Sequence, residues 1–196
     1  MIDEKGSEVD GDEIIAILAN YLNIDKIAIT VMANQGLLNW AKDNHIHTEI
    51  TAVGDANVAE AMQKNNIPIG GEQSGHIILP DEPTGDGMLT TLMVVKAISE
   101  TGHSLHSLAN IITKSPQVII NLPATPNQKE TLKTSEKVKN LLLEYSKKLE
   151  PEQGRLLVRP SGTENLIRIC MWGNNKDIID TLANELNNKL GNILWL

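Results

Sequence analysis

One short segment, RLLVRPSGTENLIR, places two arginines and two hydroxyl side chains around a glycine. Arg159 and Arg168 stand near its ends, where their guanidinium groups could hold an oxyanion through paired hydrogen bonds. Ser161 and Thr163 add hydroxyl donors, and Gly162 can take a positive φ that lets backbone amides converge on an anion. The pattern indicates a phosphate-binding loop, but an ordinary hairpin turn with surface arginines uses the same residue types.

A second segment, GGEQSGH, follows an apolar run that is typical of a strand. Glu72 and Ser74 lie two residues apart, and a carboxylate with a hydroxyl at this spacing can hold neighbouring hydroxyl groups of a sugar. His76 could transfer a proton. The alternative is a β-hairpin in which Glu72 faces solvent and His76 packs within a strand. Together the two segments predict one ligand with hydroxyl groups and a phosphate, which is a phosphosugar.

Composition narrows the classes of function. The formal net charge of −8 argues against nucleic acid or an acidic membrane as a partner, because both need clustered Lys and Arg. Cys170 is the single cysteine, so no intramolecular disulfide can form, which is typical of the cytoplasm. No apolar run reaches the roughly 18 residues of a membrane span. The acidic, polar N-terminus does not resemble a secretory signal, and we therefore expect a soluble cytoplasmic protein.

The first part of the chain alternates short β-branched runs with segments of helical spacing. Asp10 or Asp12 would cap the first helix, Asp86 would cap the fourth, and residues 34–36 would form a turn. This alternation predicts a parallel or mixed sheet covered by helices. The helices are expected at 12–22, 37–44, 56–64, 87–101 and 104–112, and the strands at 26–32, 47–53, 67–71 and 76–79.

The second part begins after the segment KSPQV, with a domain boundary near residue 115. Its pattern predicts a strand, a helix, two strands and a helix, which is a small α+β domain. The predicted fold class is therefore α/β, a mixed α/β sheet domain followed by a smaller α+β domain. The elements of the second part are expected at 118–122, 129–148, 155–173 for the arginine-rich hairpin, and 175–190.

Several motifs occur in an order that resembles a known family. GGEQSGHII, TGDG and RPSGTENLIRI, together with VDGDEI, VMANQGL and TAVGD, are similar to the C-terminal half of bacterial phosphoglucosamine mutases, in the α-D-phosphohexomutase family. The resemblance covers essentially the whole chain. It implies the tail of a metal-binding second domain at 1–11, a sugar-binding third domain at 12–115 and a phosphate-binding fourth domain at 116–196.

The resemblance also implies an activity and a role for each candidate residue. The family enzyme converts glucosamine 6-phosphate to glucosamine 1-phosphate, which leads to UDP-N-acetylglucosamine and peptidoglycan precursors. Glu72 and Ser74 would hold sugar hydroxyl groups, with His76 close by. The phosphate that is not transferred would be held by Arg159, Ser161, Gly162, Thr163 and Arg168.

Two family motifs are absent from the sequence, the phosphorylated serine loop similar to TASHNP and the magnesium loop similar to DGDGDR. Asp10 and Asp12 fit better as the end of the second domain and a helix cap. Mg²⁺ is therefore implied for the full-length enzyme, and no metal ligand or catalytic residue is assigned to this chain, which we predict to be inactive alone. Ala56, Asn57 and Asn165 depart from the family pattern, and their effect stays open.

Three functions stay open on the sequence. The chain could be one half of a phosphoglucosamine mutase, a standalone phosphosugar-binding module, or a fragment of a phosphomannomutase or phosphoglucomutase. Within the resemblance, Gln73 favours the glucosamine branch. The expected partners are a phosphosugar and either the missing N-terminal half or a second copy of the chain. A chain that starts just after the metal loop should expose apolar surface on residues 12–22 and their neighbours, so we expect self-association or limited solubility.

Overall fold

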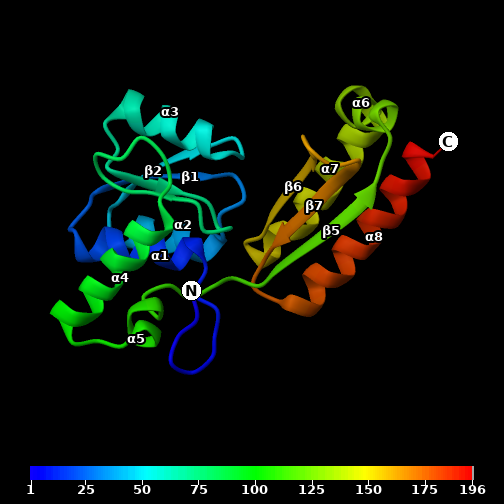
Figure 1. The fold of residues 1–196 in the computed structure, drawn as a ribbon. Coiled ribbons are helices and arrows are strands. Elements are labelled where there is room, and N and C mark those ends of the chain that lie inside the picture. Colours follow the sequence, from blue (N-terminus) through cyan, green and yellow to red (C-terminus); the bar gives the residue numbers. More distant parts are fainter. Residues whose placement is uncertain (196) are drawn as a thin grey trace. The chain divides into compact units, whose positions relative to one another are not determined.

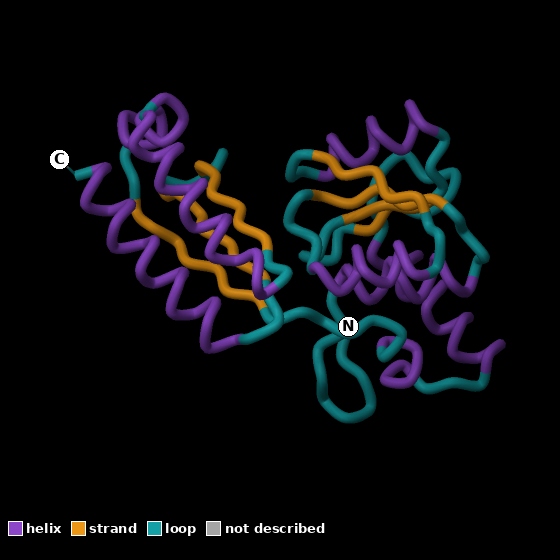
Figure 2. Tube along the Cα trace, turned by 180° about the vertical axis from the view of Figure 1, so that it is seen from behind, coloured by secondary structure: helices purple, strands orange, loops and turns teal. Residues whose placement is uncertain are grey.

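The computed structural model describes residues 1–195, and the chain divides into two compact units between Lys114 and Ser115. Each unit has its own sheet and its own apolar core (Figure 1; Figure 2). The first unit has a mixed sheet with helices on both faces, and the second has a smaller antiparallel sheet. This arrangement confirms the predicted fold class.

The first unit is built on a four-stranded sheet in the order β2-β1-β3-β4. β1 runs parallel to both β2 and β3, whereas β4 runs antiparallel to β3. The chain therefore reverses direction in a tight turn between β3 and β4, and this turn consists of residues 72–76 of the GGEQSGH segment. The strands are β1 Lys26–Thr30, β2 His47–Thr51, β3 Ile69–Gly71 and β4 Ile77–Ile78.

Helices cover both faces of this sheet. α3 lies on one face, where Val58 and Met62 contribute to a small apolar cluster, and α1 and α2 lie on the other face (Figure 1). Asp10 caps α1, because its carboxylate accepts from the amides of Asp12 and Glu13. The helices are α1 Gly11–Tyr21, α2 Gln35–Asp43, α3 Asp55–Asn65, α4 Gly87–Thr101 and α5 Leu105–Ala109.

The second unit packs its helices on one face of a three-stranded sheet in the order β5-β7-β6. Ile167, Ile169 and Met171 of the central strand point into the core that α7 and α8 cover. Alternation places Arg168 and Cys170 on the opposite face. The elements are β5 Gln117–Pro123, α6 Pro126–Thr134, α7 Glu136–Leu149, the short 3₁₀ helix η1 Glu150–Glu152, β6 Arg155–Pro160, β7 Leu166–Trp172 and α8 Lys176–Leu194.

Two local predictions are wrong. The single helix expected at 129–148 is two helices, because Ser135 has an extended backbone and its hydroxyl caps α7 at the Val138 amide. The turn expected at 34–36 is the start of α2, because Asn34 caps that helix through the Gly36 amide. Side-chain capping explains both differences, since Ser and Asn favour helix starts over helix interiors.

The apolar surface expected on residues 12–22 is also not found. Ile14, Ile15, Ile17 and Leu18 of α1 are buried in the core of the first unit. Large exposed apolar side chains cluster instead on α4. A search of residues 1–195 for a long apolar helix of membrane-spanning length finds none.

Candidate functional site

The β3–β4 turn brings the three predicted sugar-binding residues together. Two backbone hydrogen bonds close it, from the Glu72 amide to the His76 carbonyl at 3.0 Å and from the Gly75 amide to the Glu72 carbonyl at 2.9 Å. Gly75 has a φ of +99°, which a glycine tolerates best. The Ser74 hydroxyl lies 3.2 Å from Nδ1 of His76, and the Glu72 carboxylate lies 3.9 Å from the same nitrogen.

The side chains of this turn differ from the simple hairpin alternative. The Glu72 side chain is only 14% exposed, whereas the His76 side chain is 64% exposed and lies outside β4. Oε1 of Glu72 accepts a hydrogen bond from the Gly54 amide at 3.0 Å, at the start of α3. Glu72 is therefore held in place from a second element, while Ser74 and His76 are open to a ligand.

Gly11, the first residue of α1, contacts the backbone of this turn directly. Its amide donates to the Gln73 carbonyl at 3.0 Å. A Cβ atom at Gly11 would lie 2.0 Å from the Glu72 carbonyl oxygen and 2.9 Å from the Gly75 nitrogen. Because real Cβ atoms do not approach backbone this closely, the position of the turn depends on the absence of a side chain at Gly11. We define residues 72–76 as the sugar loop.

A charged cluster lies at the same end of α1. Nζ of Lys114 lies 3.0 Å from Oδ2 of Asp10 and 2.6 Å from Oε2 of Glu13. Burial lowers the pKa of Lys114, but its hydrogen bonds to Glu13 and Asp10 outweigh that effect and shift the pKa upward. Lys114 is the last residue of the first unit. Its ion pairs therefore connect the end of this unit to the start of α1, next to the sugar loop.

Asp12 is a buried carboxylate within this cluster. Burial raises its pKa to about 7, and the charges of Asp10 and Glu13 add to the rise, while the Asn34 amide and Lys114 oppose it. Oδ2 accepts from the Asn34 amide at 2.7 Å, and Oδ1 has no hydrogen-bond partner among the described residues. Asp12 therefore links α1 to α2 and is not the helix cap.

The β6–β7 hairpin brings the predicted phosphate-binding residues together. Arg159 and Arg168 are directly paired across the two strands, on the sheet face that the helices leave open. Ser161 is buried, its amide donates to the Leu166 carbonyl, and its hydroxyl accepts from the Glu164 amide at 3.1 Å. This turn is held by its own hydroxyl group, and we define residues 161–165 as the phosphate loop.

Gly162 does not use the backbone freedom that the sequence suggested. Among the described residues, the glycines with positive φ are Gly6, Gly54, Gly75 and Gly102, so Gly162 keeps a φ that other residues also adopt. Gly162 and Thr163 are exposed at the tip, and none of the hydrogen bonds found within residues 1–195 uses their amides. Both amides are therefore available to an anion in this conformation.

Lys129 of α6 supports the phosphate loop and was not singled out in the sequence. Its ammonium group donates to the Ser161 carbonyl at 2.9 Å and also to the Glu164 carbonyl. Arg168 donates from Nε to Oδ1 of Asn121 at 3.0 Å and lies 3.3 Å from the Glu164 carboxylate. Lys129 thus binds two backbone carbonyl groups of the phosphate loop, and Arg159 and Arg168 lie on the strands next to it.

The sheet face next to the arginines also includes Trp172 and Cys170 of β7. Arg155 lies over the Trp172 ring at 4.1 Å from its centroid, a cation–π contact. Burial raises the pKa of Cys170 to about 11, although the three neighbouring arginines lower it. Since the thiolate is the nucleophilic form, Cys170 is not a candidate nucleophile at neutral pH.

Residues 1–195 offer no group of three or more His, Cys, Asp and Glu side chains that could hold a metal ion. The donor set needed for Mg²⁺ is therefore not found in the described part of this chain, and no magnesium-dependent step is assigned to it.

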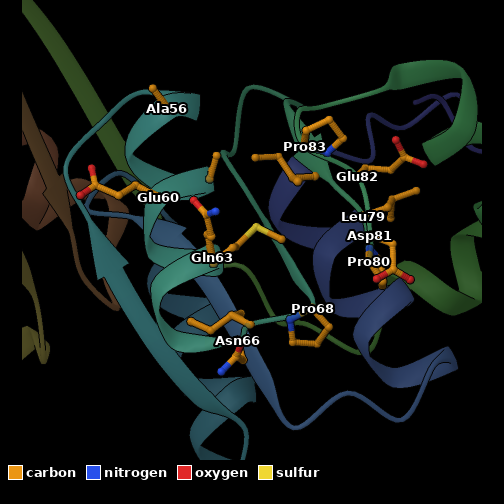
Figure 3. A pocket seen from close by; sticks show the side chains of 14 residues that line it. Ala56, Glu60, Gln63, Asn66, Pro68, Leu79, Pro80, Asp81, Glu82 and Pro83 are labelled. Carbon is orange, nitrogen blue, oxygen red and sulfur yellow. The ribbon is translucent and has the colours of Figure 1, made fainter.

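A cavity of about 730 Å³ lies elsewhere in the first unit, between α3 and the segment after β4 (Figure 3). Its lining includes the apolar residues Met62 and Ile78, and Glu60, Asp81 and Glu82 supply three carboxylates. These charges repel a phosphate group, and the cavity contains none of the predicted sugar-binding residues. It is therefore not a candidate site for a phosphosugar.

Comparisons with known proteins agree with both folds. Residues 10–115 match the family model described as phosphoglucomutase/phosphomannomutase, alpha/beta/alpha domain III, and residues 119–189 match the C-terminal domain of the same family. The chain belongs to this family. The resemblance noted in the sequence to the C-terminal half of a phosphohexomutase is thereby confirmed.

Two similar proteins are both named phosphoglucosamine mutase. The protein of Natranaerobius thermophilus is 42% identical over 192 residues, which cover 94% of this chain and 43% of that protein. The protein of Clostridium perfringens strain SM101 is 40% identical over 199 residues, which cover 96% of this chain and 44% of that protein. The chain therefore spans less than half the length of the curated relatives it matches.

Solved structures show the same fold at much lower identity. The N-acetylphosphoglucosamine mutase of Aspergillus fumigatus, in complex with GlcNAc-6P and magnesium, matches with a TM-score of 0.78 and 16% identity, over 96% of this chain and 48% of that chain. A phosphoglucomutase/phosphomannomutase family protein of Burkholderia thailandensis matches with a TM-score of 0.73 and 15% identity, over 96% of this chain and 43% of that chain. At this level of identity the likeness concerns the fold alone.

Proposed function

We propose that this chain supplies the sugar- and phosphate-binding half of a phosphoglucosamine mutase, the isomerase that interconverts glucosamine 6-phosphate and glucosamine 1-phosphate. In this proposal residues 1–11 are the end of the second domain, residues 12–115 are the sugar-binding domain and residues 116–196 are the phosphate-binding domain. The wider role is in cytoplasmic synthesis of UDP-N-acetylglucosamine and peptidoglycan precursors. Both similar proteins carry the name of this enzyme.

The observation that carries the proposal is the pairing of Arg159 with Arg168 beside the phosphate loop. Two guanidinium groups on neighbouring strands can bind one phosphate from the same side. In this proposal the Ser161 hydroxyl and the amides of Gly162 and Thr163 complete the phosphate site. The site binds the phosphate that stays on the sugar, so it orients the substrate and transfers nothing itself.

The sugar loop supplies the second half of substrate recognition in this proposal. Oε1 of Glu72 is occupied by the Gly54 amide, which leaves Oε2 to accept from a sugar hydroxyl. Ser74 can donate to or accept from a neighbouring hydroxyl, and His76 sets its direction through the 3.2 Å contact. A fixed carboxylate with an adaptable hydroxyl distinguishes a sugar from an inorganic phosphate.

Catalysis is not assigned to the isolated chain. Phosphoryl transfer in the family is implied to need a phosphorylated serine loop and a magnesium loop, and neither motif occurs in this sequence. We therefore propose that residues 1–196 alone bind phosphosugar without turning it over. A mutase assay on this preparation, free of host enzyme, tests this point, and turnover above background would contradict it.

The decisive experiment is a calorimetric titration of the chain with glucosamine 6-phosphate. Arg159→Ala should weaken binding by about tenfold or more, because a charge-assisted hydrogen bond contributes roughly 1.5–3 kcal/mol. Lys189→Ala is the matched control, since it removes one exposed cation of the same unit from α8. Equal binding by all three proteins, or no binding by the unaltered chain, would contradict the proposed site.

Substrate choice is tested by titrating mannose 6-phosphate in parallel. Ser74→Ala should reduce the affinity for glucosamine 6-phosphate and leave the affinity for inorganic phosphate unchanged, because Ser74 is expected to contact only the sugar. Tighter binding of mannose 6-phosphate would favour a phosphomannomutase fragment instead.

A further inference from the structure

Gln73 lies in the middle of the sugar loop, and the proposed function gives its side chain no role. Its neighbours in the chain are Glu72 and Ser74, the two residues proposed to hold sugar hydroxyl groups. Nε2 of Gln73 donates to Oδ2 of Asp10 at 3.5 Å, across 63 positions of the sequence. The Gln73 side chain therefore reaches the start of α1, whereas the Ser74 hydroxyl contacts His76 within the loop.

A backbone hydrogen bond joins the same two segments. The Gly11 amide donates to the Gln73 carbonyl at 3.0 Å, and Gly11 directly follows Asp10 in the chain. The side-chain bond to Asp10 is long and therefore weak by itself, whereas the backbone bond has an ordinary length. Gln73 thus contacts the first turn of α1 twice, and a change of charge in its side chain would act next to the backbone bond.

Both carboxylate oxygens of Asp10 are used at this helix start. Oδ1 accepts from the amides of Asp12 and Glu13, and Oδ2 lies 3.0 Å from Nζ of Lys114. Nζ of Lys114 also lies 2.6 Å from the Glu13 carboxylate. The Asp10 and Glu13 side chains are only 14% and 11% exposed, so solvent screens their charges weakly. One ammonium group already faces two carboxylates, and a neutral amide donor at position 73 suits this cluster better than a third carboxylate.

We propose that Gln73 is a positioning residue, which fixes the sugar loop on the first turn of α1 through Asp10 and does not contact the sugar. This inference rests on the proposed function, because it assigns Gln73 to the support of the site for glucosamine 6-phosphate. The effect of Gln73 on sugar binding is then indirect. It acts through the positions of Glu72 and Ser74 on either side of it.

Gln73→Glu tests the contact with little change in shape, since it replaces the donating amide by a carboxylate that faces Asp10. Two like charges at this distance repel each other. We expect the Gly11 amide of the full chain, without ligand, to exchange its hydrogen with solvent at least about fivefold faster. Hydrogen exchange followed by NMR measures this rate. The amides of β1 should keep their protection, which would show that the sheet stays folded.

Asp10→Asn provides a rescue that a general structural defect would not show. Asparagine keeps an oxygen that can cap α1, and it can turn its amide nitrogen toward position 73. A carboxylate at position 73 would then accept from this nitrogen, so the donor and the acceptor exchange places. In the Asp10→Asn background, Gln73→Glu should therefore change the exchange rate of the Gly11 amide by less than about twofold. The same acceleration in both backgrounds would overturn the proposal.

Calorimetric titration connects this contact with the ligand. Gln73→Glu should weaken the binding of glucosamine 6-phosphate by about fivefold or more and leave the binding of inorganic phosphate unchanged, because only the sugar loop is displaced. Gln63→Glu is the matched control, since Gln63 is exposed on α3 and the same charge is added outside both loops. Equal losses in the two variants, or equal losses for the two ligands, would contradict a role in positioning the sugar loop.

Hydrogen exchange separates this inference from the proposed function, because it needs no ligand. If the exchange rates follow the expected pattern and the unaltered chain does not bind glucosamine 6-phosphate, Gln73 positions the loop and the proposed ligand is wrong. If the unaltered chain binds the phosphosugar, and Gln73→Glu changes neither the affinity nor the exchange rate, the proposed function stands and the positioning role is wrong.

Discussion

The sugar loop and the phosphate loop are stabilised in different ways. The sugar loop is positioned by backbone groups from other elements, since the amides of Gly11 and Gly54 donate to it. The phosphate loop is positioned by side chains, mainly the Lys129 ammonium and the Ser161 hydroxyl. A loop held by close backbone approach is sensitive to added atoms, whereas a loop held by a cation is sensitive to lost charge.

The largest effect is expected from a substitution that disrupts the backbone contact between Gly11 and the sugar loop. Gly11→Ala adds a Cβ that would lie 2.0 Å from the Glu72 carbonyl oxygen, so either the loop or α1 must move. We expect the free energy of unfolding to fall by about 3 kcal/mol, as for other overpacked sites. Urea unfolding measures this change, and the affinity for glucosamine 6-phosphate should fall with it.

Gly87→Ala is the matched control for Gly11→Ala. Both glycines are the first residue of a helix capped by an aspartate, but a Cβ at Gly87 meets nothing within 4 Å. Alanine favours helix over glycine, so this control should be neutral or slightly more stable. If both variants unfolded at the same urea concentration, close packing under the sugar loop would not be what positions it.

The second effect concerns Asp12, the buried carboxyl group in the first turn of α1. The pKa of Asp12 in the folded protein is about 7, above its ordinary value of 3.8. Between pH 4 and pH 7 the carboxyl group is therefore protonated in the folded state and ionised in the unfolded state. Stability from this group is therefore present below about pH 4, falls as the pH rises toward 7, and is lost above that. Burial is the main cause of the raised pKa; the charges of Asp10 and Glu13 raise it further, and Lys114 lowers it.

Asp12→Asn should remove this pH dependence. A rise of the pKa from 3.8 to about 7 corresponds to at most about 4 kcal/mol of lost stability at high pH. The buried amide has its own desolvation cost, so we expect a gain of about 2 kcal/mol at pH 8 that shrinks at pH 5. Urea unfolding at both pH values is the measurement, with the exposed Asp43→Asn variant as control. A gain that is equal at both pH values would contradict a raised pKa.

Sequence patterns predicted the sheets because their information is local. The β-branched runs and the aspartate caps identify elements without tertiary contacts: Asp86 is the predicted cap of α4, and Asp10 is the one of the two candidate aspartates that caps α1. The break at Ser135 was missed because apolar spacing continues on both sides of it, so the capping signal was outweighed by periodicity.

The supports of the candidate site were harder to predict than its motifs. The sequence quoted both loops, but Lys129 reaches carbonyl groups 32 and 35 residues away, and nothing local marks that contact. Gly54 is similar, because its amide meets Glu72 18 residues later. Gly11 carried no clearer signal, because Gly87 also follows an aspartate at a helix start and a Cβ there would meet nothing within 4 Å.

The smallest of these effects tests the side-chain support of the phosphate loop. Lys129→Met keeps most of the aliphatic chain and removes the ammonium group that donates to Ser161 and Glu164. We expect the free energy of unfolding to fall by about 1 kcal/mol, the usual value of a partly exposed hydrogen-bonded group. The affinity for glucosamine 6-phosphate should fall by about tenfold, because both the loop geometry and a nearby positive charge are lost.

Lys133→Met separates these two causes from a general loss of charge. Lys133 lies one turn further along α6, is exposed and, within residues 1–195, forms an ion pair only with Glu130 at 3.6 Å. Its replacement should leave both stability and phosphosugar affinity nearly unchanged. If Lys133→Met and Lys129→Met weakened binding equally, long-range charge would explain the effect and the carbonyl contacts would not. If Lys129→Met bound normally, the Ser161 hydroxyl and the strand pairing would be sufficient to shape the loop, and the two loops would be more alike than their contacts indicate.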